Sequence, residues 1–497
     1  MKGKNIFGFI LTLLVVLSAA MGTYGYCLVY DDFFNAAFNA LMLFVLGIDG
    51  EAPNVWVAIA RWIAPITTAS GVLSAFGPAK RLISNKFKIL LFKKKTVALY
   101  GPEEYIEKLQ EENQIMDDYV LLDTDCGRQF VSGAGRYVLL WSDEENGQFL
   151  GRYNIELEGK EVYFLSQVYE PMISENINFH PIKEEFQAAR KYWKENPLFD
   201  GFNNTNPEYK DVRVTIIGFE DLGEMIMTQG LLLNIIHPKQ SIIYDIFPGE
   251  EFSSVNKGKY YKQREKFLNL HCQLDKICDE IIFHDNAWYE DKDLLKKSSR
   301  VIITDVDESA RVLQDIVKSI PPKALTEARI DVFTNDSERM QKTLDKAYNI
   351  NVIEYRQLSL EDIIGDRLIE AAKEYNYNYF LEYVSQTKVY SKKERDQEWD
   401  KLNSFKKYSN IASADYDVIR GLIADACDGD IDLLKELEHI RWERFHYVNN
   451  WSRATGDVTK DEGLWLHSDL VPFEELTIEE QNKDVSQIMH FIRSRKK

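Results

Sequence analysis

Several features typical of enzymes and nucleic-acid-binding proteins are missing from this 497-residue chain. It has no Gly-x-Ser-x-Gly elbow, no HExxH helix and no Gly-rich loop ending in Lys-Ser/Thr, so no hydrolase or P-loop site is indicated. The formal net charge is −19, whereas nucleic-acid-binding proteins carry an excess of basic residues. Cysteine is sparse, and no Cys-x-x-Cys pair occurs among Cys27, Cys126, Cys272, Cys278 and Cys427. We therefore expect a non-enzymatic protein without a metal site or nucleic-acid partner, with its bulk in a reducing compartment.

Charge is missing altogether from three stretches near the N-terminus. Residues 5–30, 33–48 and 62–79 hold no charged side chain. The first stretch exceeds the ~20 residues that cross a bilayer as a helix. A cleaved signal peptide is the alternative, because two lysines precede the apolar core and small residues at 18–20 could be a cleavage site. The apolar stretches that follow at once favour a membrane-anchored protein.

Basic residues around these stretches predict their orientation. All seven charged residues between positions 80 and 95 are Lys or Arg, and the positive-inside rule places this end in the cytoplasm. Two crossings then satisfy both ends, and the short middle stretch fits a re-entrant or pore helix. We expect residues 1–92 to form a transmembrane helix, a re-entrant helix and a second transmembrane helix. The predicted location is the inner (plasma) membrane of a prokaryote, with both termini cytoplasmic.

This order of helices resembles the pore module of two-helix potassium channels. The resemblance implies a homo-oligomer, a dimer or tetramer, around a path for monovalent cations. The loop that corresponds to the family's Thr-Val-Gly-Tyr-Gly filter contains Gly47, Asp49 and Gly50. Its glycine spacing differs by one residue, so potassium selectivity is not indicated. Asp49 and Glu51 could form an acidic ring that favours cations, or could belong to an ordinary extracellular turn.

From residue 96 onward, short apolar runs alternate with helical patterns. Buried-strand patterns occur at 96–101, 119–123, 137–141, 212–217, 241–245, 279–285 and 300–309. This series predicts an α/β fold with a parallel, doubly wound sheet whose site lies at the carboxyl ends of the strands. It resembles the Rossmann-like RCK (Trk-type) nucleotide-binding domain. The resemblance implies a degenerate first copy over 93–200 and a second copy over 205–395.

The turn after the strand at 212–217 carries part of the phosphate-binding fingerprint Gly-x-Gly-x-x-Gly. Gly218 and Gly223 occupy its outer positions, but Glu220 stands where the second glycine lets the backbone approach a pyrophosphate. Acidic residues suit the start of a helix without any ligand. We interpret the motif as a structural relic.

Three aspartates near strand ends are further candidates in the same region. Asp245 could bind a ribose hydroxyl or, together with Asp305 and Asp307, a cation. The alternative is that all three are solvated strand ends.

The last fifth of the chain interleaves aromatic and polar residues. Residues 437–451 read LEHIRWERFHYVNNW, and residues 463–476 read GLWLHSDLVPFEEL. Helical spacing places two neighbouring rows on the first segment: Glu438, Arg441 and Phe445, then His439, Trp442 and His446. An amphipathic core helix is one interpretation of this pattern.

With LNSFKKYSNIASADY at 402–416, this tract resembles the ryanodine-receptor-repeat (RyR) domain, which predicts a mainly α-helical domain over 396–497. Asn450 stands where that family has Gly before a Trp. In prokaryotic chains such domains are thought to sense nucleotide-derived molecules, so the resemblance implies a small nucleotide-like ligand. The residues assigned to it are Asn410, Glu438, His439, Arg441, Trp442, Trp451, Arg453 and His467.

These patterns predict a homo-oligomeric, ligand-gated membrane effector or ion channel. Its cytoplasmic RCK-like and RyR-like domains would sense a nucleotide-derived ligand in antiviral or stress signalling. A membrane-anchored nucleotide sensor or scaffold without a pore is the alternative. A nucleotide-processing enzyme with an N-terminal anchor is a third hypothesis. No cofactor is assigned besides the nucleotide-derived ligand.

Overall fold

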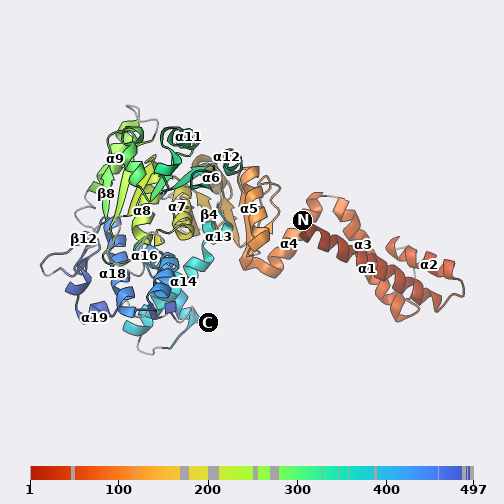
Figure 1. Cartoon of the computed structure of the whole chain (residues 1–497). Helices are drawn as coiled ribbons and strands as arrows, with labels where there is room; N and C mark the ends of the chain where they lie inside the picture. The colour runs from red at the N-terminus through yellow and green to blue at the C-terminus, as the bar shows by residue number, and fades with distance from the viewer. Residues whose placement is uncertain are drawn as a thin grey trace. The chain divides into compact units, whose positions relative to one another are not determined.

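The chain divides into two compact units. The computed structural model describes residues 2–45, 51–75, 77–116, 118–167, 178–199, 212–249, 256–268, 279–326, 328–344, 346–355, 358–385, 389–456, 458–483, 488–489 and 491–492. The first unit comprises residues 1–103 and 119–138, and the second comprises residues 104–118 and 139–497. Figure 1 shows the elements of both.

The first unit begins with helices that pack through small residues. They are α1 (Lys2–Cys27), α2 (Phe33–Met42), α3 (Val55–Ala75) and α4 (Gly77–Phe92), with 3-10 turns at Leu43–Val45 and Lys93–Lys95. Helix α1 contacts both α2 and α3. A Cβ at Gly22 would lie 3.1 Å from the Cβ of Ala40, and Ala36, Ala60 and Ala64 are buried in the same cluster. Such residues allow close approach of helices.

The predicted membrane segment is only partly covered by the structure. Within the described ranges, no helix combines the length and the apolar character of a membrane span. Gly47, Asp49 and Gly50, the predicted filter residues, lie outside the described residues. The re-entrant helix and the pore therefore stay predictions.

Strands β1 (Thr96–Tyr100), β2 (Val120–Leu122) and β3 (Arg136–Leu139) follow the helices. Strand β1 lies between the other two and runs parallel to β2. Two residues of the basic cluster contact the segment that includes and follows β2: Arg81 pairs with Asp125 at 2.7 Å, and Lys88 donates to the Leu121 carbonyl at 2.8 Å. Part of that cluster therefore serves the fold of this unit.

The second unit contains the remaining elements. Its helices are α5 (Glu103–Met116, from residue 104), α6 (Asp143–Arg152), α7 (Glu184–Glu195), α8 (Asp221–Leu233), α9 (Asn256–Leu268), α10 (Lys292–Lys297), α11 (Ser309–Ser319), α12 (Ser337–Thr343), α13 (Leu360–Ile364), α14 (Asp366–Tyr383), α15 (Lys392–Asp400), α16 (Ser404–Asp415), α17 (Asp417–Ala426), α18 (Ile431–Val448) and α19 (Ile478–Gln481). Its strands are β4 (Glu161–Leu165), β5 (Asn178–Ile182), β6 (Val212–Ile217), β7 (Ile242–Phe247), β8 (Glu280–Phe283), β9 (Arg300–Ile303), β10 (Arg329–Thr334), β11 (Ile350–Glu354), β12 (Ser452–Arg453), β13 (Lys460–Asp461) and β14 (Leu466–His467). Three 3-10 turns complete it, at Trp288–Glu290, Pro322–Ala324 and Phe473–Glu475.

Six strands form the parallel, doubly wound sheet that the sequence predicts. Their order is β11-β10-β9-β6-β7-β8, and all neighbours run parallel. The chain adds β7 and β8 on one side of β6 and β9 to β11 on the other, as in dinucleotide-binding folds. Successive residues of β6 enter different cores, Ile216 in one and Ile217 in the other. Both faces of the sheet are therefore covered, which explains the many Ile, Val and Phe residues of its strands.

The C-terminal helices share one of these cores. Tyr416, Leu437 and Ile440 belong to the same buried cluster as Leu231 of α8, and α18 contacts α8 directly. Figure 1 shows α18, in blue, next to α8. An ion pair of 2.6 Å between Arg190 and Asp415 also joins α7 to α16. Helices α16 and α18 are thus placed by packing against the sheet region.

Candidate ligand-binding pocket

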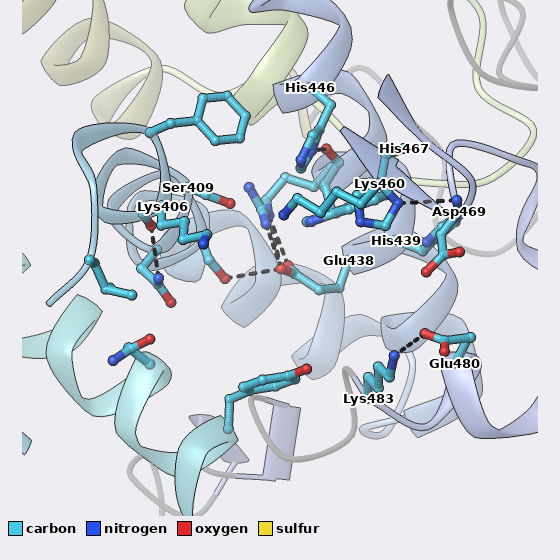
Figure 2. Close-up of a pocket in the computed structure, with 18 of the residues that line it drawn as sticks. Lys406, Ser409, Glu438, His439, His446, Lys460, His467, Asp469, Glu480 and Lys483 are labelled. Carbon is cyan, nitrogen blue, oxygen red and sulfur yellow. Dashed lines mark hydrogen bonds and ion pairs between the residues drawn. The ribbon is translucent and has the colours of Figure 1, made fainter. Parts of the chain in front are cut away.

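A cavity of about 460 Å³ opens among the C-terminal elements (Figure 2). Helices α14, α16 and α18, strands β13 and β14 and the segment around α19 supply its walls. The lining residues are Asn376, Tyr379, Leu402, Phe405, Lys406, Ser409, Asn410, Ser413, Glu438, His439, Arg441, Trp442, His446, Lys460, His467, Asp469, Leu476, Glu480 and Lys483. This volume falls within the range of small-molecule pockets.

Glu438 forms the centre of a buried charge network in the pocket wall. Its carboxylate accepts hydrogen bonds from Nη2 of Arg441 at 2.7 Å, from Nη2 of Arg420 at 2.5 Å and from the Ser413 hydroxyl at 3.1 Å. Burial alone would raise the pKa of Glu438, but the two guanidinium groups hold that pKa below its usual value. Glu438 therefore stays ionised and serves as the counter-charge for two arginines.

Arg441 retains hydrogen-bonding capacity. Its side chain is 2% exposed, and it lines the cavity. Nε and Nη2 are engaged by Glu438, whereas the buried Nη1 has no hydrogen-bond partner within the described part of the chain. A buried donor without a partner costs about 1–3 kcal/mol. An anionic or carbonyl group of a ligand would satisfy it.

Aromatic rings cover one side of the pocket. Trp442 is half-buried. The centroid of its ring lies 4.1 Å from that of His446 and 5.0 Å from that of His467. Phe405 stands edge-on to His446 at 5.1 Å. These rings form a wall on which a planar group can stack.

Two lining histidines are neutral at physiological pH. Burial lowers the pKa of His446 to about 3, and burial also lowers the pKa of His467. Nδ1 of His446 donates to the Trp442 carbonyl at 2.8 Å, while Nδ1 of His467 accepts from the Asp469 amide at 3.1 Å. The second ring nitrogens are then an acceptor on His446 and a donor on His467, a pair suited to the polar edge of a base.

The structure brings six of the eight residues assigned from the RyR resemblance to this cavity. They are Asn410, Glu438, His439, Arg441, Trp442 and His467. Trp451 lies behind the wall, buried and stacked on Phe405 at 4.9 Å. Arg453 does not line the cavity; its side chain is 57% exposed and faces Glu475 at 3.5 Å. Ligand binding by the six stays a prediction.

The sequence did not single out several of the residues that line the cavity. Lys406 and Phe405 lie in the 402–416 segment that carried the resemblance, so their basic and aromatic character was a usable signal. Asn376 and Tyr379 belong to α14, outside the predicted 396–497 domain. No local pattern connects them to the tract, because only the packing of α14 on α16 brings them near.

Other atoms of the chain fill the space beside the glycines that follow β6. Gly218 has a φ of +99°, and a Cβ there would lie 2.7 Å from the Asp305 amide nitrogen. A Cβ at Gly223 would lie 2.6 Å from the Gly218 carbonyl oxygen, and one at Gly249 would lie 3.0 Å from an Asp305 carboxylate oxygen. Asp305 thus sits against two glycines of the loops where a phosphate would approach. This arrangement agrees with a structural role for the motif.

Asp245 is not a solvated strand end, and that alternative is wrong. Its side chain is fully buried within β7. It pairs with Arg213 at 2.5 Å and with Nε2 of His284 at 2.8 Å, which satisfies both oxygens. The described residues contain no group of three or more His, Cys, Asp or Glu side chains able to hold a metal ion, and a cation site with Asp305 and Asp307 stays a prediction.

Comparisons with known proteins do not assign this chain to a family. No protein-family model matches the chain, and no curated protein matches it. Among solved structures, a GsuK mutant is 14% identical, covering 73% of this chain and 96% of its own with a TM-score of 0.30. The A chain of dipicolinate synthase from Bacillus subtilis is 11% identical (56% and 96% covered, TM-score 0.25), and D-lactate dehydrogenase from Salmonella is 9% identical (66% and 96% covered, TM-score 0.17). Similarities at these scores assign neither a family nor a function.

Proposed function

We propose that this protein is a sensor that binds a small, anionic, nucleotide-derived ligand in the pocket between α14, α16 and α18. The observation that carries the proposal is the buried Arg441, whose Nη1 has no partner in the described part of the chain, in a cavity that also presents the half-buried Trp442. A base would stack on Trp442, and an oxygen of the ligand would accept from Arg441.

Calorimetric titration of the purified full chain tests this function. The panel contains nucleosides, nucleoside mono- and diphosphates and dinucleotides. We expect at least one nucleotide to bind, and Trp442→Ala to remove that binding while the thermal unfolding of the chain remains cooperative. Arg453→Gln is the matched control on the exposed side of the tract, and its affinity should equal that of the wild type. Undiminished binding by Trp442→Ala would place the site elsewhere.

We propose that the chain is anchored in the inner (plasma) membrane of a prokaryote and that ligand binding acts there. The uncharged stretches at 5–30 and 62–79 support this, as do exposed apolar side chains such as Phe34 (81% exposed) and Trp62 (77% exposed). Apolar surface of this kind marks contact with a membrane or a partner. Recovery of the chain in the carbonate-washed membrane fraction is expected, and recovery in the supernatant would contradict the anchor.

A homo-oligomeric ligand-gated channel for monovalent cations is the proposed effector, with antiviral or stress signalling as its context. A ligand shifts such a pore only through its different affinities for the open and closed forms. Ion flux from liposomes that contain the protein, with the bound nucleotide added, distinguishes the channel from a sensor without a pore. A nucleotide incubated with the protein should be recovered unchanged, since no catalytic set is predicted.

A further inference from the structure

One carboxylate, that of Glu462, lies against two lysines of the pocket wall. Its Oε1 is 3.0 Å from Nζ of Lys406 on α16 and 3.5 Å from Nζ of Lys460 on β13. Both lysines line the cavity, whereas Glu462 does not. Two cations from elements far apart in the sequence are therefore held together by a single anion beside the cavity.

Lys460 has a further contact that does not involve Glu462. Nζ of Lys460 lies 5.6 Å above the ring of Trp451, and that ring stacks on Phe405, the residue before Lys406. A cation over a Trp ring is stabilised without a counter-ion. The Lys460 ammonium group would thus keep its position if another anion replaced Glu462.

The contacts that hold Glu462 are exposed ones, and they include a 3.3 Å hydrogen bond from Nδ2 of Asn403 to its Oε2. Its side chain is 47% exposed, and those of Lys406 and Lys460 are 44% and 37% exposed. The hydrogen bond from Lys406 lowers the pKa of Glu462, so the carboxylate is charged at neutral pH. Exposed ion pairs contribute little to stability, and a phosphate offers more charge and more acceptor oxygens than a carboxylate.

We propose that Lys406 and Lys460 form the subsite for a phosphate group of the ligand, and that Glu462 occupies this subsite as an internal anion until the phosphate displaces it. The proposal rests on the proposed function and narrows it to phosphate-bearing ligands, because a nucleoside would leave Glu462 in place. It also assigns a regulatory role to Glu462, which competes with the ligand for the two lysines.

The test is calorimetric titration of the full chain with inorganic pyrophosphate, AMP and adenosine. Glu462→Gln should bind pyrophosphate and AMP about two- to tenfold more tightly than the wild type, the effect of losing one or two exposed ion pairs. Its affinity for adenosine should not change. Glu479→Gln removes the same charge from an exposed position on α19 and should alter every affinity less than Glu462→Gln does. Lys406→Gln should weaken the binding of AMP but not that of adenosine.

The outcomes separate the two proposals. Tighter pyrophosphate binding by E462Q, with no nucleotide or nucleoside bound by any form, keeps the phosphate subsite and overturns the nucleotide sensor. Equal affinity of AMP and adenosine, unchanged in E462Q, overturns the subsite and leaves the sensor. Equal gains in E462Q and E479Q would show a general charge effect and overturn the subsite. Failure of all three probes with both wild type and E462Q overturns the subsite, and failure of the whole nucleotide panel as well overturns the sensor.

Discussion

Arg444 and Asp279 form an ion pair of 2.9 Å in which neither side chain is exposed to solvent. Arg444 lies on α18, the helix that carries Glu438, Arg441 and Trp442 into the pocket, and Asp279 immediately precedes β8 of the six-stranded sheet. Arg444 also donates to the Leu231 carbonyl of α8 at 3.2 Å. Helix α18, which lines the pocket, is thus fixed to the doubly wound region by a residue that does not itself line the pocket.

The buried pair predicts a large effect of breaking it. Arg444→Met leaves the Asp279 carboxylate buried without its counter-charge, and the expected loss is about 3–5 kcal/mol in the free energy of unfolding. Arg453→Met, at an exposed ion pair, should cost less than ~1 kcal/mol. Denaturant unfolding of the full chain compares the two. Equal losses would contradict the assigned importance of the pair, whereas partial recovery in an Arg444→Met, Asp279→Leu double variant would support it.

His446 predicts a pH dependence of stability. Its pKa is lowered by burial to about 3 in the folded chain and is about 6.5 when unfolded. Below pH 6.5 the unfolded chain therefore binds a proton that the folded chain does not, so stability falls as the pH decreases from about 6.5 towards 3. From pH 7 to pH 5 the loss from this one group is about 2 kcal/mol. Thermal unfolding at both pH values should show a smaller loss in His446→Phe than in the wild type; parallel losses would contradict the assignment.

Gly218 predicts a structural rather than a ligand-binding phenotype. Its φ of +99° and the 2.7 Å approach to the Asp305 amide oppose any side chain, so Gly218→Ala should cost about 1–3 kcal/mol. Gly147→Ala, in α6 with no atom within 4 Å of the new Cβ, should instead gain up to ~1 kcal/mol. Nucleotide affinity of folded Gly218→Ala should match the wild type. A selective loss of affinity would show that the loop after β6 is a binding site.

The sequence predicted what local periodicity controls. The apolar runs that gave the strands of the sheet are buried on both faces, and the row His439, Trp442, His446 is realised on α18 with ring contacts. Asn450 adopts a φ of +64°, a left-handed backbone conformation that Gly adopts freely and that Asn tolerates.

Tertiary partners were beyond the reach of the sequence. For Asp245 the sequence left open a ribose- or cation-binding role and a solvated strand end, whereas in the structure Arg213 and His284 come from other segments to pair with it. Arg453 resembled its neighbours in the tract, yet it lies outside the cavity. Both placements depend on which elements pack together, and a single segment does not encode that.

The most direct measurement of the central claim locates the bound nucleotide on the chain. The full protein is photo-crosslinked with an azido derivative of AMP, or of whichever nucleotide binds best, and the labelled peptides are mapped by mass spectrometry. We predict labels within α16 (Ser404–Asp415) or α18 (Ile431–Val448), removed by the unlabelled nucleotide and absent from Trp442→Ala. A label in the segment from β6 to α8, residues 212–233, would contradict the assignment of the sensory site.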